Sequence, residues 1–152
     1  MAQEQNLSAR TVYADIDPLV LVHGRAILAD NPETRVVVGD VREPKTILGH
    51  DEVIGFLDFE RPMALMLVGM LHYLSPDIGD QVVGTLRDAL APGSYLFMTS
   101  LVDTGLPAQQ ELARITREKF EKGWARTPEE IERHFGDLEL VEAGRNADRP
   151  WL

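Results

Sequence analysis

The sequence contains no cysteine among its 152 residues. That absence excludes disulfides, thiolate nucleophiles and cysteine-ligated zinc or iron–sulfur sites. Long apolar runs are lacking too, since the longest, residues 63–71, is far shorter than the ~20 residues that span a bilayer. The first ten residues have no apolar core of the kind found in signal peptides. We therefore expect a cytoplasmic protein that does not use a membrane as a partner.

Positive charge is scarce. The chain has 15 lysine and arginine residues against 25 aspartate and glutamate residues, a net charge of −10. Binding to a nucleic acid backbone depends on cationic side chains that displace counterions. The charge balance therefore predicts that nucleic acid is not a partner.

Several catalytic and binding motifs are also missing. The sequence has no G-x-x-x-x-G-K-[ST] loop and no G-x-G-x-x-G loop, which counts against nucleotide hydrolases and nicotinamide enzymes. A G-x-S-x-G elbow is absent, which counts against a serine hydrolase. The four histidines show neither H-x-H nor H-E-x-x-H spacing, so we expect no metal site.

What is present is ordinary globular composition, with 44% hydrophobic and 26% charged residues. A chain of this length can bury a sizeable core without disulfides or metals. No internal repeat or linker divides it. We expect a single domain over residues 1–152.

Strand and helix patterns alternate along the chain. Proline at a first helical position, after Asp17, Ser75 and Thr127, predicts three helix starts. Strands are expected over residues 11–14, 35–39, 62–69, 94–100 and 138–142, with short helices between 44 and 57 and a longer helix over 107–124. This alternation predicts an α/β fold with a mostly parallel sheet and helices on both faces.

Two segments allow more than one interpretation. Residues 62–69 are apolar throughout, which is typical of a strand buried on both faces, although a buried helix segment fits as well. Residues 114–126 are basic and contain Phe120 and Trp124. We interpret them as a solvated helix face, and a lid over a substrate is the alternative.

Acidic residues follow the first two predicted strands. In open parallel sheets, ligands bind at the carboxyl ends of the strands. Asp15 ends the first strand and could accept hydrogen bonds from both hydroxyls of a ribose. Asp40, at the end of the next strand, could accept from an exocyclic amine, so the pair would suit an adenosine. The alternative is that both are ordinary loop or cap residues.

At this point the sequence resembles a known family. The resemblance covers residues 11–144 and is to the class I, Rossmann-like S-adenosylmethionine-dependent methyltransferases, in a poorly characterised bacterial branch. It is carried by five blocks in the family's order: VYADIDPLVLVHGRAIL, GDVREPKTIL, RPMALMLVGMLHYL, LRDALAPGSYLFMTS and TPEEIERHFGDLELVEAG. The resemblance implies S-adenosylmethionine as cofactor and a small molecule or a protein as methyl acceptor.

The resemblance also implies a site at three strand ends. Asp15 would hold the ribose, with Ile16 on the adenine, and Asp40 would face the adenine amine, with Val41 beside it. The methionine part would lie near Gly69, Met70 and Leu71.

His72 follows that segment and could face the substrate. As a catalytic residue it would be a general base, because histidine titrates near neutral pH. A structural role is the alternative.

One departure from the family concerns the start of the chain. Such methyltransferases begin with a strand and a D-x-G-x-G loop, and nothing like it precedes Thr11. In the family's strand order, 3-2-1-4-5-7-6, that first strand is central. We therefore expect either that the two halves of the sheet pair directly or that an unpaired edge remains. Exposed apolar edges invite pairing with another chain, so a homodimer is possible.

Two other functions stay open. The first is a truncated, non-catalytic relative that binds a partner or dimerises. The second is a fragment of a nucleotide-sugar or nicotinamide enzyme, which the blocks after residue 60 do not fit.

Overall fold

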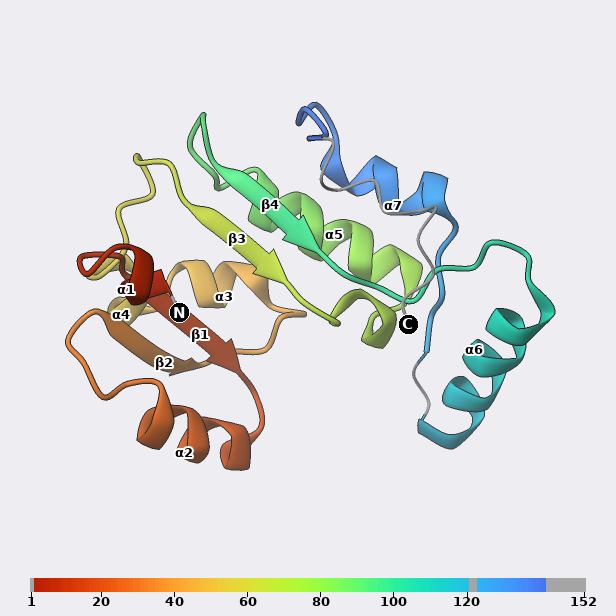
Figure 1. The fold of residues 1–152 in the computed structure, drawn as a ribbon, viewed down its shortest axis with the longest axis horizontal. Helices are drawn as coiled ribbons and strands as arrows, with labels where there is room; N and C mark the ends of the chain where they lie inside the picture. The colour runs from red at the N-terminus through yellow and green to blue at the C-terminus, as the bar shows by residue number, and fades with distance from the viewer. Residues whose placement is uncertain (1, 121–122, 142–152) are drawn as a thin grey trace.

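The computed structural model describes residues 2–120 and 123–141 (Figure 1). Strands and helices alternate through most of this length. In chain order they are α1 (Ala2–Gln5), β1 (Thr11–Asp15), α2 (Pro18–Ile27), β2 (Thr34–Val38), α3 (Pro44–Leu48), α4 (Asp51–Ile54), β3 (Ala64–Leu67), the 3₁₀ helix η1 (Leu71–Tyr73), α5 (Pro76–Arg87), β4 (Tyr95–Met98), α6 (Pro107–Phe120) and α7 (Pro128–Phe135). The predicted α/β class is confirmed.

The strands form two separate parallel pairs. β1 pairs with β2, and β3 pairs with β4. β1 and β3 point in the same direction but share no ladder (Figure 1). The two halves of the sheet therefore do not pair directly. The other expected arrangement, in which unpaired strand edges remain, is the one observed.

Helix starts follow the predicted caps. The carboxylate of Asp17 accepts from the N–H groups of Leu19 and Val20 at the start of α2. Thr127 and Glu130 form a capping box at the start of α7. These bonds satisfy N–H groups that have no partner inside the helix. The helix predicted over 107–124 is present over Pro107–Phe120, and residues 123–124 are not helical.

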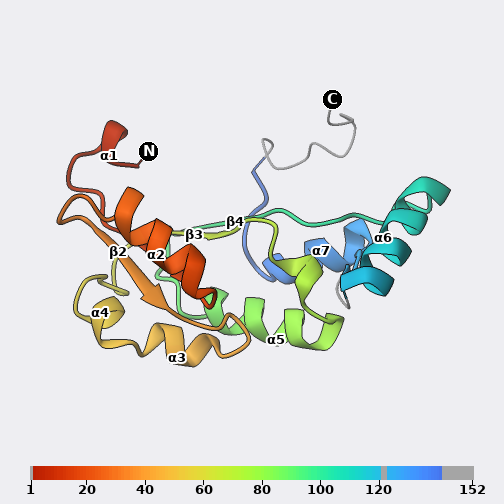
Figure 2. The same ribbon diagram turned by 90° about the horizontal axis from the view of Figure 1, so that it is seen from below.

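The main core lies between α5 and one face of the β3–β4 sheet. Its buried members, each at most 6% exposed, are Leu67, Leu71, Leu74, Val82, Val83 and Leu86. Leu65 and Met98 pack partly buried against them. Figure 2 shows α3, α4 and α5 together on this side of the strands.

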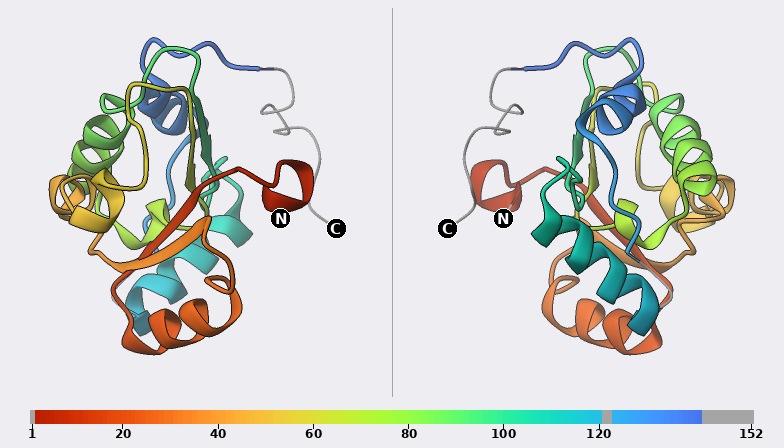
Figure 3. Two further views of the ribbon diagram at one scale, coloured as in Figure 1. Left: turned by 90° about the vertical axis from the view of Figure 1, so that its left-hand side faces the viewer. Right: turned by 90° about the vertical axis from the view of Figure 1, so that its right-hand side faces the viewer.

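The opposite face of the β3–β4 sheet is open. The prediction that residues 62–69 are buried on both faces is wrong, because side chains of β3 alternate between core and solvent. Met66 is 62% exposed and lies in register with Phe97, which is 50% exposed. Val68 and Tyr95 are also exposed. Figure 3 shows α5 along only one face of these strands.

The strand predicted over 138–142 is a second error. Residues 138–141 form no strand, and Glu142 lies outside the described residues. The N–H of Leu138 donates to the carbonyl of Phe135, so the segment begins inside the turn that ends α7. Gly136, with φ +57°, makes that turn.

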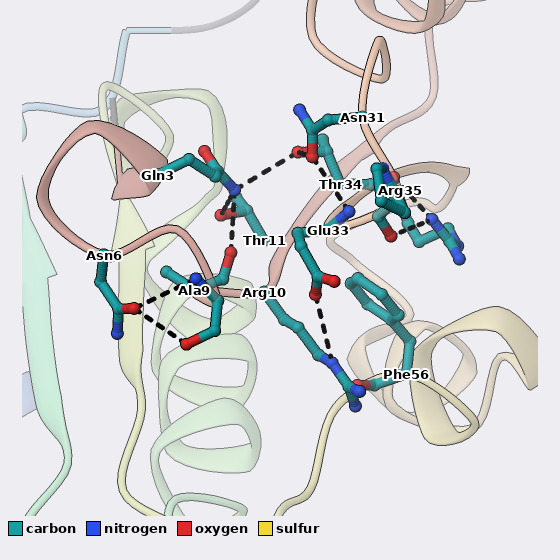
Figure 4. Close-up of polar contacts among 12 residues, drawn as sticks. Gln3, Asn6, Ala9, Arg10, Thr11, Asn31, Glu33, Thr34, Arg35 and Phe56 are labelled. Atoms are coloured by element: carbon teal, nitrogen blue, oxygen red, sulfur yellow. Dashed lines mark hydrogen bonds and ion pairs between the residues drawn. The ribbon is translucent and has the colours of Figure 1, made fainter.

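Polar contacts tie the amino ends of β1 and β2 to the neighbouring loops (Figure 4). The amide of Gln3 donates to the carbonyl of Ala9 at 2.9 Å and to the hydroxyl of Thr34 at 3.4 Å. Arg10 donates to the carbonyl of Phe56, and Arg35 stacks on the Phe56 ring. This end of the strands is held by internal contacts, so a ligand is expected at the other end.

Candidate functional site

The carboxyl ends of β1 and β2 meet. The N–H of Gly39 donates to the carbonyl of Asp15 at 2.9 Å, and Asp15 lies in register with Val38. Gly39 has no room for a side chain, since a Cβ there would lie 2.6 Å from the side chain of Ile47. The chain therefore turns closely beside Asp15, and Asp40 follows at once on the adjacent strand end.

Asp15 is half-buried and faces the start of α2. One carboxylate oxygen accepts from the N–H of Asp17 at 2.8 Å. A carboxylate has about four lone-pair positions, so Asp15 can accept further hydrogen bonds. Ile16, next in the chain, is 55% exposed and offers an apolar surface beside it.

Asp40 is held by Arg42. The guanidinium donates to both carboxylate oxygens, from Nε at 2.9 Å and also from Nη2. These hydrogen bonds lower the pKa of Asp40 below its usual value, against a smaller opposing effect of burial. Val41 turns the other way and packs partly buried against the main core. Asp40 is thus ionised at neutral pH, with part of its accepting capacity used by Arg42.

The end of β3 makes a tight turn. Gly69 has φ +63°, a conformation that favours glycine, and its N–H donates to the hydroxyl of Thr99 at 2.8 Å. Met70 is half-buried. The side chain of Leu71 is 1% exposed and belongs to the core, so only its main chain can face a ligand.

His72 lies just beyond this turn. Its ring contacts that of Tyr73 at a tilt of 36°, with centroids 4.4 Å apart, and its Nδ1 is buried without a hydrogen-bond partner in the described part of the chain. Burial lowers the pKa of His72, and the charge of Arg126 lowers it further. The imidazole is therefore neutral at neutral pH and can accept a proton.

The predicted site residues fall into two groups. Asp15, Ile16 and Asp40 lie together at the β1–β2 ends, whereas the residues from Gly69 to His72 follow β3 in the other sheet. All of these strand ends face the same side of the molecule (Figure 1). The β-ladders that would fix the spacing between the two groups are not formed.

Arg126 was not among the residues that the sequence singled out for the site. It is only 2% exposed, so the prediction that residues 114–126 form a solvated face is wrong for this residue. Its guanidinium donates to carbonyls of the turn that carries His72. The nearest signal in the sequence is its place directly before the capping residue Thr127.

Two surface hollows are lined by none of the predicted site residues. One, of about 200 Å³, is lined by α5 and α7. The other, of about 430 Å³, is lined by Asp103, after β4, and by side chains of α6 such as Arg114 and Arg117. Within residues 2–120 and 123–141, no group of histidine, aspartate and glutamate side chains could hold a metal ion. Nor is any helix in those ranges long and apolar enough to cross a membrane.

Comparison with known proteins gives concordant matches. A family model described as "S-adenosyl methyltransferase" matches residues 1–152. A Mycolicibacterium vanbaalenii protein named as a candidate S-adenosyl-L-methionine-dependent methyltransferase is 33% identical over an alignment of 143 residues, and the match covers 88% of this chain and 40% of that protein.

Solved structures agree. A candidate methyltransferase of Thermobifida fusca is 71% identical with a TM-score of 0.88, covering 93% of this chain and 53% of that one. A DUF574 family protein of Streptomyces avermitilis is 34% identical with a TM-score of 0.83, covering 93% and 55%. LepI in complex with SAM, at 14% identity and a TM-score of 0.62 over 88% and 32%, shares the fold alone. The chain thus spans about half the length of the first two of these structures.

Proposed function

The chain belongs to the S-adenosyl methyltransferase family, and on that premise we propose that it takes part in methyl transfer from S-adenosylmethionine to a small-molecule or protein acceptor. The family's cofactor supplies an electrophilic methyl group on a sulfonium centre. Little covalent chemistry is then asked of the protein, whose contribution is to position the reactants. The net charge of −10 favours these acceptors over nucleic acid.

The observation that carries the proposal is the pair of carboxylates at adjacent strand ends. Asp15 keeps lone pairs for the two ribose hydroxyls, which is the role an acidic residue takes at this position of nucleotide-binding folds. Asp40 would accept from the adenine amine, and the exposed Ile16 would pack on the ring. Only the main chain of Val41 would lie beside it, because its side chain packs against the core. Together these residues fit an adenosine.

The residues after β3 would lie near the methionine part of the cofactor and the methyl group that is transferred. Gly69, Met70 and the main chain of Leu71 would lie along the methionine portion, because the positive φ of Gly69 brings backbone rather than side chain to the surface. His72 would accept the proton released by a hydroxyl or amine acceptor as its bond to the methyl group forms. Its lowered pKa supports this role, because the imidazole is then neutral and able to accept a proton at neutral pH.

Chemical-shift mapping tests the site. In ¹⁵N-labelled chain, adenosine should shift the amides of Asp15, Ile16, Gly39 and Val41 alone. S-adenosylhomocysteine should shift these and also the amides of Gly69, Met70 and His72. Shifts confined to other surfaces, or none from a chain with a well-dispersed spectrum, would contradict the proposal.

A second candidate function is a module that binds a partner or a second copy without catalysis. It is favoured by the open apolar face with Met66, Val68, Tyr95 and Phe97, since exposed apolar patches and unpaired strand edges mark association surfaces. The same titration separates the two functions. A pure binding module would associate through this face and leave the strand-end amides unmoved by S-adenosylhomocysteine.

A further inference from the structure

Arg126 is a buried cation whose neighbours are main-chain oxygens. It is 2% exposed, which makes it one of the largest fully buried side chains. Nη1 donates to the carbonyl of Leu71 at 2.6 Å, and Nη2 donates to those of Leu74 at 3.1 Å and Ser75 at 3.2 Å. These carbonyls all belong to η1 and the residues that lead into α5. A single guanidinium therefore fastens the whole turn that follows β3.

The residues before Arg126 add to this hold. The N–H groups of Gly123 and Trp124 both donate to the carbonyl of His72, at 2.8 and 2.9 Å. On its other side, Arg126 is bound to the segment after β4, because its N–H donates to Leu101 and its carbonyl accepts from Asp103. Residues 123–126 thus link the turn that carries His72 to the segment after β4.

The helix beside Arg126 leaves room for it. Gly79 is in the first turns of α5, and a Cβ at this position would collide with Nη2 of Arg126. Its absence lets the guanidinium lie against the helix backbone and reach Leu74 and Ser75. Gly84, further along the same helix, has open space where its Cβ would be. The requirement for glycine is therefore specific to the place where the guanidinium passes.

Burial disfavours the charged form of Arg126 and so lowers its pKa. The negative charges of Asp80 and Glu130 raise the pKa by a smaller amount, so it stays below its usual value. A buried charge of this kind is weak evidence for stability, because an apolar side chain of similar size often stabilises the fold to the same extent. What an arginine adds is a planar fork with fixed donor directions, which lysine does not have. Arginine at this position therefore contributes the fixed directions of its hydrogen bonds rather than stability.

We propose that Arg126 is a positioning residue, which fixes residues 71–75 so that His72 is held at the end of β3. The inference rests on the proposed function, since it is there that His72 faces the methyl acceptor. Arg126 itself touches no reactant. It acts through the carbonyls of Leu71, Leu74 and Ser75.

The test is the imidazole NMR spectrum of His72 in the full chain, assigned with His72→Gln. Arg126→Lys keeps the charge and removes the fork, so we expect the His72 ring signals to shift and its titration midpoint to rise toward the ordinary histidine value. Arg87→Lys is the matched control. Arg87 also donates to a carbonyl, that of His134, and lies against a glycine, Gly136, but it fastens α7. Its replacement should leave His72 unchanged.

Gly79→Ala is a second variant in case Arg126→Lys does not fold, because its Cβ displaces the guanidinium while arginine is retained. Unchanged His72 signals in the folded variant, with only a lower melting temperature, would overturn the proposal. The readout needs no cofactor. If the His72 signals shift but S-adenosylhomocysteine does not bind, the positioning role is upheld and the proposed function is contradicted. If S-adenosylhomocysteine binds but the His72 signals do not shift, the proposed function is upheld and the positioning role is contradicted.

Discussion

The N–H of Gly39 donates a 2.9 Å hydrogen bond to the carbonyl of Asp15, and this bond brings the ends of β1 and β2 to one place on the rim. It sets Asp40, the next residue after Gly39, beside Asp15. The proposed adenosine site depends on this junction. A larger residue at 39 would meet Ile47 and push the strand ends apart.

The Asp40–Arg42 pair predicts a pH-dependent stability. Because its partner lowers the pKa of Asp40, the pair stabilises the fold above the unfolded-state value near pH 4 and loses that effect as pH falls below it. Arg42→Ala should therefore reduce the free energy of unfolding at pH 7 by a small amount, because the pair is largely exposed, and this reduction should shrink as pH falls below about 4. Urea unfolding across this range measures it. When Asp40 is already replaced by Asn, Arg42→Ala should have no pH-dependent effect on stability. A pH-dependent effect in that background would refute the pairing.

Two glycines of α5 should respond oppositely to alanine. Gly79→Ala places a Cβ against Arg126 and should destabilise by about 1–3 kcal/mol, as overpacking does. Gly84→Ala meets open space and should stabilise by about 0.5–1 kcal/mol through helix propensity. Thermal unfolding of both variants gives the comparison. Equal effects would mean that Arg126 does not lie where the structure has it.

His134 predicts a loss of stability on mild acidification. It is 5% exposed, and burial lowers its pKa although Asp80 opposes the effect. A lowered pKa means that the unfolded chain binds more protons, so stability is present above about pH 6.5 and falls as pH drops through that region. His134→Gln should reduce the change in the urea unfolding midpoint between pH 8 and 5. The part of that change that comes from His72 should remain. An unchanged pH dependence of the midpoint in His134→Gln would contradict the prediction.

The open face of β3 and β4 predicts self-association of the chain on its own. Met66 and Phe97, in register and exposed, form its centre. Replacing both with lysine should shift sedimentation toward the monomer, because charge at an exposed sheet face opposes pairing. Ile54→Lys, a change at an equally exposed apolar residue of α4, should have no effect. A wild-type chain that sediments as a single monomer would contradict the prediction.

Local features of the fold were predictable from the sequence. The cap at Asp17 and the capping box at Thr127 follow from residue type and spacing, and so do the strands that end at Asp15 and before Asp40. Each of these depends on neighbours within a few residues. That is why short-range patterns were sufficient.

Features that depend on distant contacts were missed. The apolar pattern of residues 62–69 predicts a strand, but whether a face is covered depends on what packs there. Arg126 looked like part of a solvated segment, yet its partner Leu71 lies 55 residues away in the sequence. The strand predicted over 138–142 failed because an alternating pattern does not show whether a neighbouring strand is available to pair with it.

The most direct test of the central claim is calorimetric titration of the purified chain with S-adenosylhomocysteine, beside Asp15→Ala and Asp58→Ala. Asp58 is the matched control, since it also accepts from the N–H two residues on but precedes β3 and so lies near the opposite end of the strands. We expect saturable binding that Asp15→Ala weakens about tenfold or more, as for loss of a hydrogen bond to a charged group, and that Asp58→Ala leaves unchanged. No binding by a demonstrably folded chain, or binding insensitive to Asp15→Ala, would contradict the account.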